Sequence, residues 1–269
     1  GVYLLCEQVE QAKERVPVDE YGGFIIESDN YYSSEPLYFT TNSGHHFTFK
    51  HPKPHKGQIA ANDEEYMFIV NYMNRFEDAI YGADFKDPEK GYRAFADPVC
   101  FARWFLVQEI CGNMDTNMYI SLRNHSSKLE VFPVWDAEWS FGLAAAQTRW
   151  AAPPTKPVIE GIYRYGSLYI YQMLHDPYFV DLTMKEWQKI KAKLPQIKSD
   201  MRATANTLKK AQAYNFKRWP ILDKYVSVGL IHLDSWEAEV DYVENFLDLH
   251  AEWFDGWMTE RYQRYCGGN

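Results

Sequence analysis

Residues 131–142 read VFPVWDAEWSFG, and this stretch sets two carboxylates, Asp136 and Glu138, within a frame of aromatic side chains. An apolar setting is costly for a carboxylate unless a partner compensates its charge. Strand alternation predicts that both acids share one face, where they repel each other unless a cation lies between them. Oxygen ligands suit Mg²⁺ or Ca²⁺, but a salt bridge to Arg or Lys explains the stretch equally well when it is taken alone.

The residues before this stretch predict a helix followed by a β-hairpin. Asp97 and Pro98 are typical of a helix start, and Gly112 is typical of its end. Two strand-like segments follow, NMYISL and KLEVFPVW, which the turn RNHSS joins. We therefore expect a helix at 97–112 and a hairpin that leads directly into the two acids.

The loop between the helix and the hairpin carries Asn113, Asp115 and Asn117. Asn and Asp are common turn residues, but loops held by rigid elements also commonly carry function. The hairpin can bring Asp115 and Asp136 to the opening of the same cleft, although they lie 21 positions apart in the sequence. One acid beside a reacting hydroxyl and another on a metal is the arrangement that phosphoryl transfer needs.

The first 60 residues read as strands. The segments GVYLLCEQV, GGFIIESD and HHFTFKH predict three strands, and the prolines at 52 and 54 end the last of them. Lys50 in the third strand and Glu27 in the second are candidate nucleotide-binding residues, because a strand lysine that faces a cleft can hold phosphate oxygens while a carboxylate orients it. The alternative is that both are ordinary exposed strand residues.

The rest of the chain is predicted to be mostly helical. Asn62 and Glu65 form a capping-box pattern at the start of a helix at 62–82. Further helices are expected at 97–112, about 166–175, 179–193, 196–214 and 234–264. This order predicts an α+β fold with a β-rich N-terminal lobe at 1–60 and a helical C-terminal lobe at 61–269, which contains the hairpin region 112–142.

The charge, apolar content and cysteine spacing of the chain argue against several classes of function. The chain has 269 residues with a net charge of -9, which argues against broad nucleic-acid binding because that needs a basic surface. No apolar run reaches the roughly 18 residues of a membrane span. The four cysteines lack zinc-site spacing, and we expect them to be thiols. A disulfide between Cys6 and Cys266 is the remaining alternative.

Several stretches in the right order resemble the CotH kinase family, the spore-coat-protein-H-like atypical kinases. They are GVYLLCEQVEQAKERV, GGFIIESD, FTFKHP, WFLVQEICGNMDTNMY, PVWDAEWSFG, NFKRWPIL and WEAEVDYVENFL. The paired N-x-D and WD-x-[DE]-x-x-x-G motifs are the most specific part of this resemblance. The resemblance implies a divergent protein-kinase-like fold and Mg-ATP-dependent phosphorylation of Ser or Thr on protein partners, in secreted, periplasmic or cell-surface settings.

The resemblance also implies roles for individual residues. Asp115 resembles the catalytic-loop acid that accepts the hydroxyl proton, and Asp136 resembles the metal-binding acid of a kinase DFG motif. Asn117 is a further candidate for the metal, and so is Glu138, which stands where many members carry a second Asp. A Glu is one methylene longer, so a second metal position is either reshaped or lost.

The sequence also departs from the family pattern. Members usually carry more β-lobe before GVYLL, so we expect this chain to be either a fragment of an active kinase or a degenerate kinase. His250 stands where an Arg is expected.

Two other functions stay open. A surface adhesin or scaffold can use a kinase-like fold without catalysis, and a glycoside hydrolase can use Asp115 and Asp136 as its carboxylate pair, about 5 to 10 Å apart.

Overall fold

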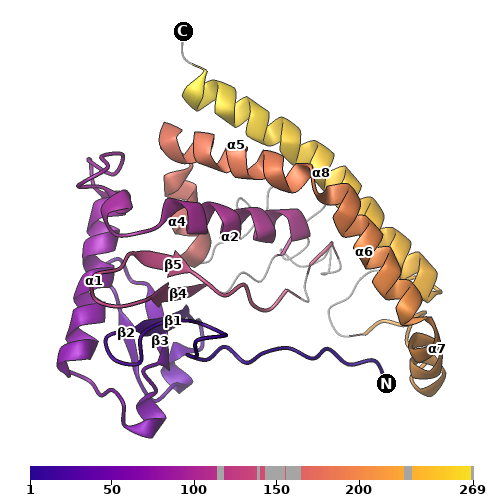
Figure 1. Cartoon of the computed structure of the whole chain (residues 1–269), viewed down its shortest axis with the longest axis horizontal. Helices are drawn as coiled ribbons and strands as arrows, with labels where there is room; N and C mark the ends of the chain where they lie inside the picture. Colours follow the sequence, from indigo (N-terminus) through magenta and orange to yellow (C-terminus); the bar gives the residue numbers. More distant parts are fainter. Residues whose placement is uncertain (114–117, 138–139, 143–154, 156–164, 227–231, 268–269) are drawn as a thin grey trace.

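The computed structural model describes residues 1–113, 118–137, 140–142, 155, 165–226 and 232–267, with the backbone alone at 165–168. It confirms a mixed α and β chain, in which one five-stranded sheet packs against helices (Figure 1). The strands are β1 (Phe24–Ser28), β2 (Tyr38–Thr40), β3 (His46–His51), β4 (Tyr119–Leu122) and β5 (Leu129–Val131). The described α-helices are α1 (Glu64–Tyr81), α2 (Pro98–Cys111), α4 (Tyr165–Met173), α5 (Pro177–Lys191), α6 (Leu194–Thr207), α7 (Lys209–Arg218) and α8 (Trp236–Cys266).

The sheet is antiparallel with the strand order β2-β3-β1-β4-β5. The central pairing joins β1 to β4, with Glu27 opposite Tyr119. The hairpin of β4 and β5 therefore extends the sheet that the first 60 residues begin. The boundary that we expected near residue 60 stays a prediction, and the sheet contains strands from both sides of it.

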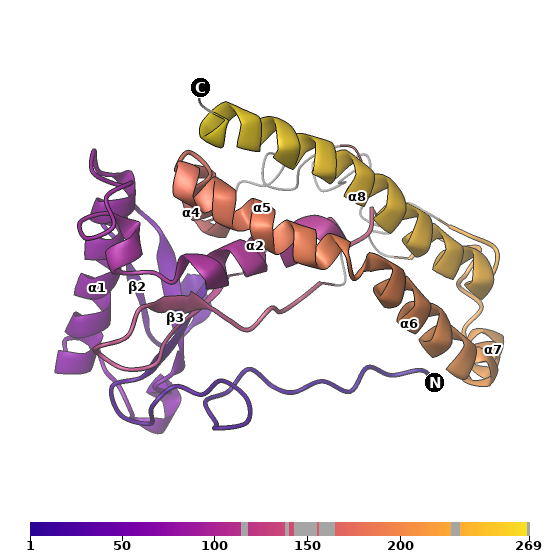
Figure 2. The ribbon, with the colours of Figure 1, turned by 45° about the horizontal axis from the view of Figure 1, so that its top comes forward.

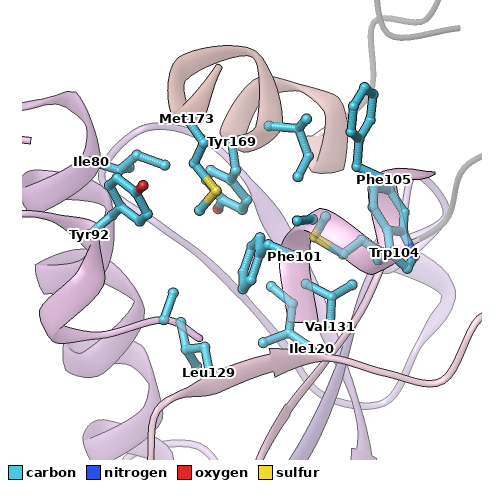
Figure 3. Packing of buried hydrophobic residues seen from close by; sticks show 14 of the residues in the cluster. Ile80, Tyr92, Phe101, Trp104, Phe105, Ile120, Leu129, Val131, Tyr169 and Met173 are labelled. Carbon is cyan, nitrogen blue, oxygen red and sulfur yellow. The ribbon is translucent and has the colours of Figure 1, made fainter. Parts of the chain in front are cut away.

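One face of the sheet builds the main core. The side chains of Phe24, Ile26 and Phe47 are fully buried on this face and belong to the same apolar cluster as residues of α1 and α2. Figure 3 shows Ile120, Leu129 and Val131 of the hairpin beside Phe101, Trp104 and Phe105 of α2. Burial of this apolar surface is the largest favourable contribution to folding.

The other face is covered by an irregular segment instead of a helix. Ile25 and Tyr119 pack there against Val16 and Val18, and the half-buried Trp135 adds to this second cluster. The expected strand at GVYLLCEQV is wrong, because residues 1–9 contain no assigned strand. The exposed fraction of the side chains at 2–5 runs from 36% to 98%, so they lack a neighbouring strand among the described residues.

Local signals placed the ends of α2 correctly. The Asp97 carboxylate accepts a hydrogen bond from the backbone N–H of Val99, and Pro98 occupies the first turn. Gly112 ends the helix in the left-handed conformation at φ 60°, which glycine adopts without steric cost. The expected capping box at α1 is wrong, since Asp63 is the N-cap residue and makes no side-chain capping bond.

The later helices form a layer beyond α2. Figures 1 and 2 show α8 running alongside α5, and both helices contact α2. The single helix expected at 196–214 is in fact two, α6 and α7, which meet at Leu208. The four cysteines are free thiols, as expected. None of the helices in the described part of the chain is both long and apolar enough to cross a bilayer.

Candidate functional site

Three of the six candidate site residues lie within the described part of the chain. These are Lys50, Glu27 and Asp136. Asp115, Asn117 and Glu138 lie outside the described residues, so the separation of Asp115 and Asp136 stays a prediction. The site is therefore built here from the segments that flank these positions.

Asn113 joins the two candidate motifs. Its side chain is fully buried, and its amide nitrogen donates to Gln108 Oε1 at 2.7 Å and to the backbone carbonyl of Asp136 at 3.2 Å. Its backbone N–H also donates to the carbonyl of Gln108 at 2.9 Å. The first residue of the N-x-D motif is thus fixed to the end of α2 and to the acid of the WD-x-E motif.

A second bond ties the same two segments. The backbone N–H of Phe141 donates to the carbonyl of Cys111 at 2.7 Å. Phe141 and the following Gly142 both have left-handed backbones, with φ of 58° and 72°. The end of α2 and the residues that follow it are therefore bonded to the WD-x-E segment at two positions, Asp136 and Phe141.

Asp136 itself has an uncommon backbone. Its φ is 62°, in the left-handed region that non-glycine residues rarely adopt, although Asp tolerates it better than most. Strand β5 ends at Val131, five residues earlier, so the strand that we expected to continue through Asp136 is wrong at that residue, while Glu138 lies outside the described residues. Pro133 follows the end of β5 closely, and because proline has no backbone N–H, it cannot donate a hydrogen bond to a neighbouring strand. Backbone strain of this kind gathers at functional sites when surrounding bonds hold it, as the Asn113 bond does here.

Lys50 and Glu27 form an ion pair on the polar face of the sheet. Lys50 Nζ lies 2.8 Å from Glu27 Oε2 and 3.9 Å from Glu35 Oε1. Burial alone lowers the pKa of Lys50, but the hydrogen bond and charge of Glu27, helped by Glu35 and Asp29, outweigh it and raise the pKa above its ordinary value. Lys50 is therefore a firmly protonated cation among several carboxylates.

Tyr119 connects this pair to Asp136. Burial raises the pKa of Tyr119 most, followed by the charge of Glu27 and the hydrogen bond to it, and then by the charges of Asp136 and Asp29. The phenol thus lies near carboxylates from both regions. Tyr119 is not among the residues that the sequence motifs indicate, yet the alternation of β4 gives the face on which it lies once Glu27 is known to lie opposite it.

A buried pair of a carboxylate and an imidazole connects α2 to α8. Glu109 and His250 are both fully buried, and His250 Nε2 lies 3.5 Å from Glu109 Oε1. The imidazole stacks with Phe246 and Trp253 at 5.5 Å between ring centroids. The pair joins α8 to the last turn of α2, directly before the N-x-D motif.

The donor chemistry of this region is that of oxygen ligands. Asp136 is half-buried and contributes a carboxylate, which suits a hard divalent cation. Within the described ranges, no three His, Cys, Asp or Glu side chains come together as a metal cluster. The other two metal candidates, Asn117 and Glu138, lie outside the described residues.

The chain matches a known protein family. A family model described as CotH kinase protein matches residues 1–254 of the 269-residue chain. It covers both motifs and confirms the resemblance that the sequence indicates. No curated protein matches the chain.

Proposed function

The chain belongs to the CotH kinase protein family, and from that premise we propose that it is an atypical protein kinase of kinase-like fold. It transfers the γ-phosphoryl group of ATP, with Mg²⁺, to a Ser or Thr of a protein partner. The family description supports nucleotide use by a kinase-like protein. We further propose an exported or surface-exposed setting for the enzyme and its partner.

One observation carries the proposal at the level of this chain. The Asn113 side chain donates to the backbone carbonyl of Asp136, so the N-x-D and WD-x-E motifs are held together although a hairpin separates them in sequence. Phosphoryl transfer is mostly positioning and charge neutralisation, and it needs an acid near the acceptor hydroxyl and another near the metal. The bond between the two motifs supports this division of roles.

The residues fit the proposed metal by their chemistry. Asp136 would hold Mg²⁺ through carboxylate oxygens, with Asn117 and Glu138 as further oxygen donors. When bound, the ion would offset the negative charge of the transferring phosphate oxygens. The strained backbone of Asp136 supports this role, because such strain persists where the surrounding structure fixes a functional side chain.

In this proposal, Asp115 acts on the Ser or Thr hydroxyl that receives the phosphoryl group. This carboxylate would accept the proton of the Ser or Thr hydroxyl and orient it for in-line attack. Lys50 would lie at the edge of the nucleotide site, where Glu27 holds its ammonium group. Because carboxylates surround Lys50, we propose that it orients the nucleotide jointly with Glu27, and that it is not an isolated phosphate clamp.

The test is a thermal titration of this chain with nucleotide. Mg-ATP at about 100 times its dissociation constant should stabilise the folded protein by about 2.7 kcal/mol, whereas ATP with a chelator should give little shift. Equal shifts in the two conditions contradict a metal-dependent site. No shift in either condition, repeated with the longest available form of the protein, favours a non-catalytic adhesin or scaffold.

A further inference from the structure

The ring of Phe246 in α8 lies against the two glycines that border the candidate motifs. A Cβ atom built on Gly112 would lie 2.7 Å from Phe246 Cζ, and one built on Gly142 would lie 3.1 Å from Phe246 Cε2. Both distances are shorter than ordinary van der Waals contact. The tip of a single ring therefore packs closely against the start of the N-x-D loop and against the end of the WD-x-E segment.

The ring is held firmly in this place. Only 2% of Phe246 is exposed, and its ring meets Phe141 edge to face at 6.0 Å. On the side toward the C-terminus of α8 it stacks with His250 at 5.5 Å. His250 in turn lies beside Glu109 of α2. A close-packed side chain with these neighbours cannot move without repacking both helices.

Two hydrogen bonds act on the same pair of segments. Asn113 donates to the carbonyl of Asp136, and the N–H of Phe141 donates to the carbonyl of Cys111. These bonds join the segments, and the tip of the Phe246 ring packs against Gly112 and Gly142 at the same place. The bonds and the packed ring together fix how the two segments lie relative to each other.

We propose that Phe246 is a positioning residue for phosphoryl transfer. Its ring packs against both Gly112 and Gly142, and it thereby fixes the end of α2 against the segment that carries Asp136. This inference rests on the proposed function. Displacement of reacting groups by about 1 Å can cost on the order of a hundredfold in rate, so loss of this packing contact acts mainly on turnover.

The experiment compares Phe246→Leu with Phe254→Leu. Phe254 lies two turns later on α8, is also fully buried, and packs edge to face on Phe105 and Trp187, away from both loops. Both variants should lower the melting temperature by similar amounts. Phe246→Leu should lower kcat by about tenfold or more with a smaller change in KM for Mg-ATP, whereas Phe254→Leu should stay within about twofold of wild type.

Hydrogen exchange gives a readout that does not need activity. The backbone amides of Asn113 and Phe141 should lose protection in Phe246→Leu and keep it in Phe254→Leu. Equal behaviour of the two variants in exchange and in turnover overturns the proposal. A wild-type protein that turns over no Mg-ATP contradicts the proposed function instead, and the exchange comparison then still decides whether the ring holds the two segments.

Discussion

The two faces of the central sheet are made from the same strands, yet they carry different chemistry. Toward α1 and α2, the buried residues are apolar, such as Phe24 and Phe47, and helices cover them. On the opposite face, Glu27, Lys50 and Tyr119 lie beside an irregular segment of the chain. One face therefore supplies apolar stabilisation, while the other carries a buried carboxylate paired with the partly exposed Lys50.

The largest effect on stability is expected on the apolar face. Phe24→Ala removes a fully buried ring that stacks on Phe68 at 5.9 Å, and it should lower the free energy of unfolding by about 3–5 kcal/mol. Tyr31→Ala, at a side chain that is 80% exposed, is the control and should change it by less than about 0.5 kcal/mol. Urea unfolding measures both variants, and similar costs would remove the contrast between core and surface.

A smaller effect is expected on the polar face. Glu27→Gln keeps the shape of the side chain but removes the charge that lies 2.8 Å from Lys50 Nζ, and it should cost about 1–3 kcal/mol. Glu35→Gln is the matched control, because that carboxylate lies 3.9 Å from the same ammonium group and is 38% exposed. It should cost less than about 1 kcal/mol. If Glu35→Gln proves the more costly of the two, the assignment of the ion pair is wrong.

The loss of unfolding free energy in Glu27→Gln should depend on pH, and this dependence tests the ion pair on the polar face. The folded-state pKa of Lys50 is raised above its ordinary 10.5, so the ion pair stabilises the fold fully below that pH and its contribution is lost as the pH rises through the folded pKa. The difference in unfolding free energy between wild type and Glu27→Gln should therefore stay constant from pH 8 to about 10 and shrink above 10.5. A difference that grows with alkaline pH contradicts the raised pKa.

Much of the fold could be predicted because its signals are local. The ends of α2 follow from Asp97, Pro98 and Gly112, whose capping preferences act within a few residues. The apolar alternation of β1 and β3 and the turn between β4 and β5 are also short-range patterns. The expected strand at residues 1–9 failed because a strand needs a partner, which its own sequence does not specify.

The site depends on contacts between distant parts of the chain, so less of it could be predicted. The motifs indicated Asp136 as a candidate, but not its left-handed backbone or the bond from Asn113 that holds it. Tyr119 reaches Glu27 only because β4 pairs with β1 in one particular register. Phe246 looks like any other core aromatic in the sequence, and only the packing of α8 places it against two loop glycines.

The most direct test of the account is phosphoryl turnover by Asp136→Ala, measured with Mg-ATP on the longest form of the protein that is active. Asp200→Ala, at an exposed position in the middle of α6, is the control. We predict that Asp136→Ala abolishes turnover while its helical circular dichroism signal stays that of wild type, and that the control retains full activity. Turnover by Asp136→Ala equal to that of wild type would remove this carboxylate from the mechanism and contradict the proposed function.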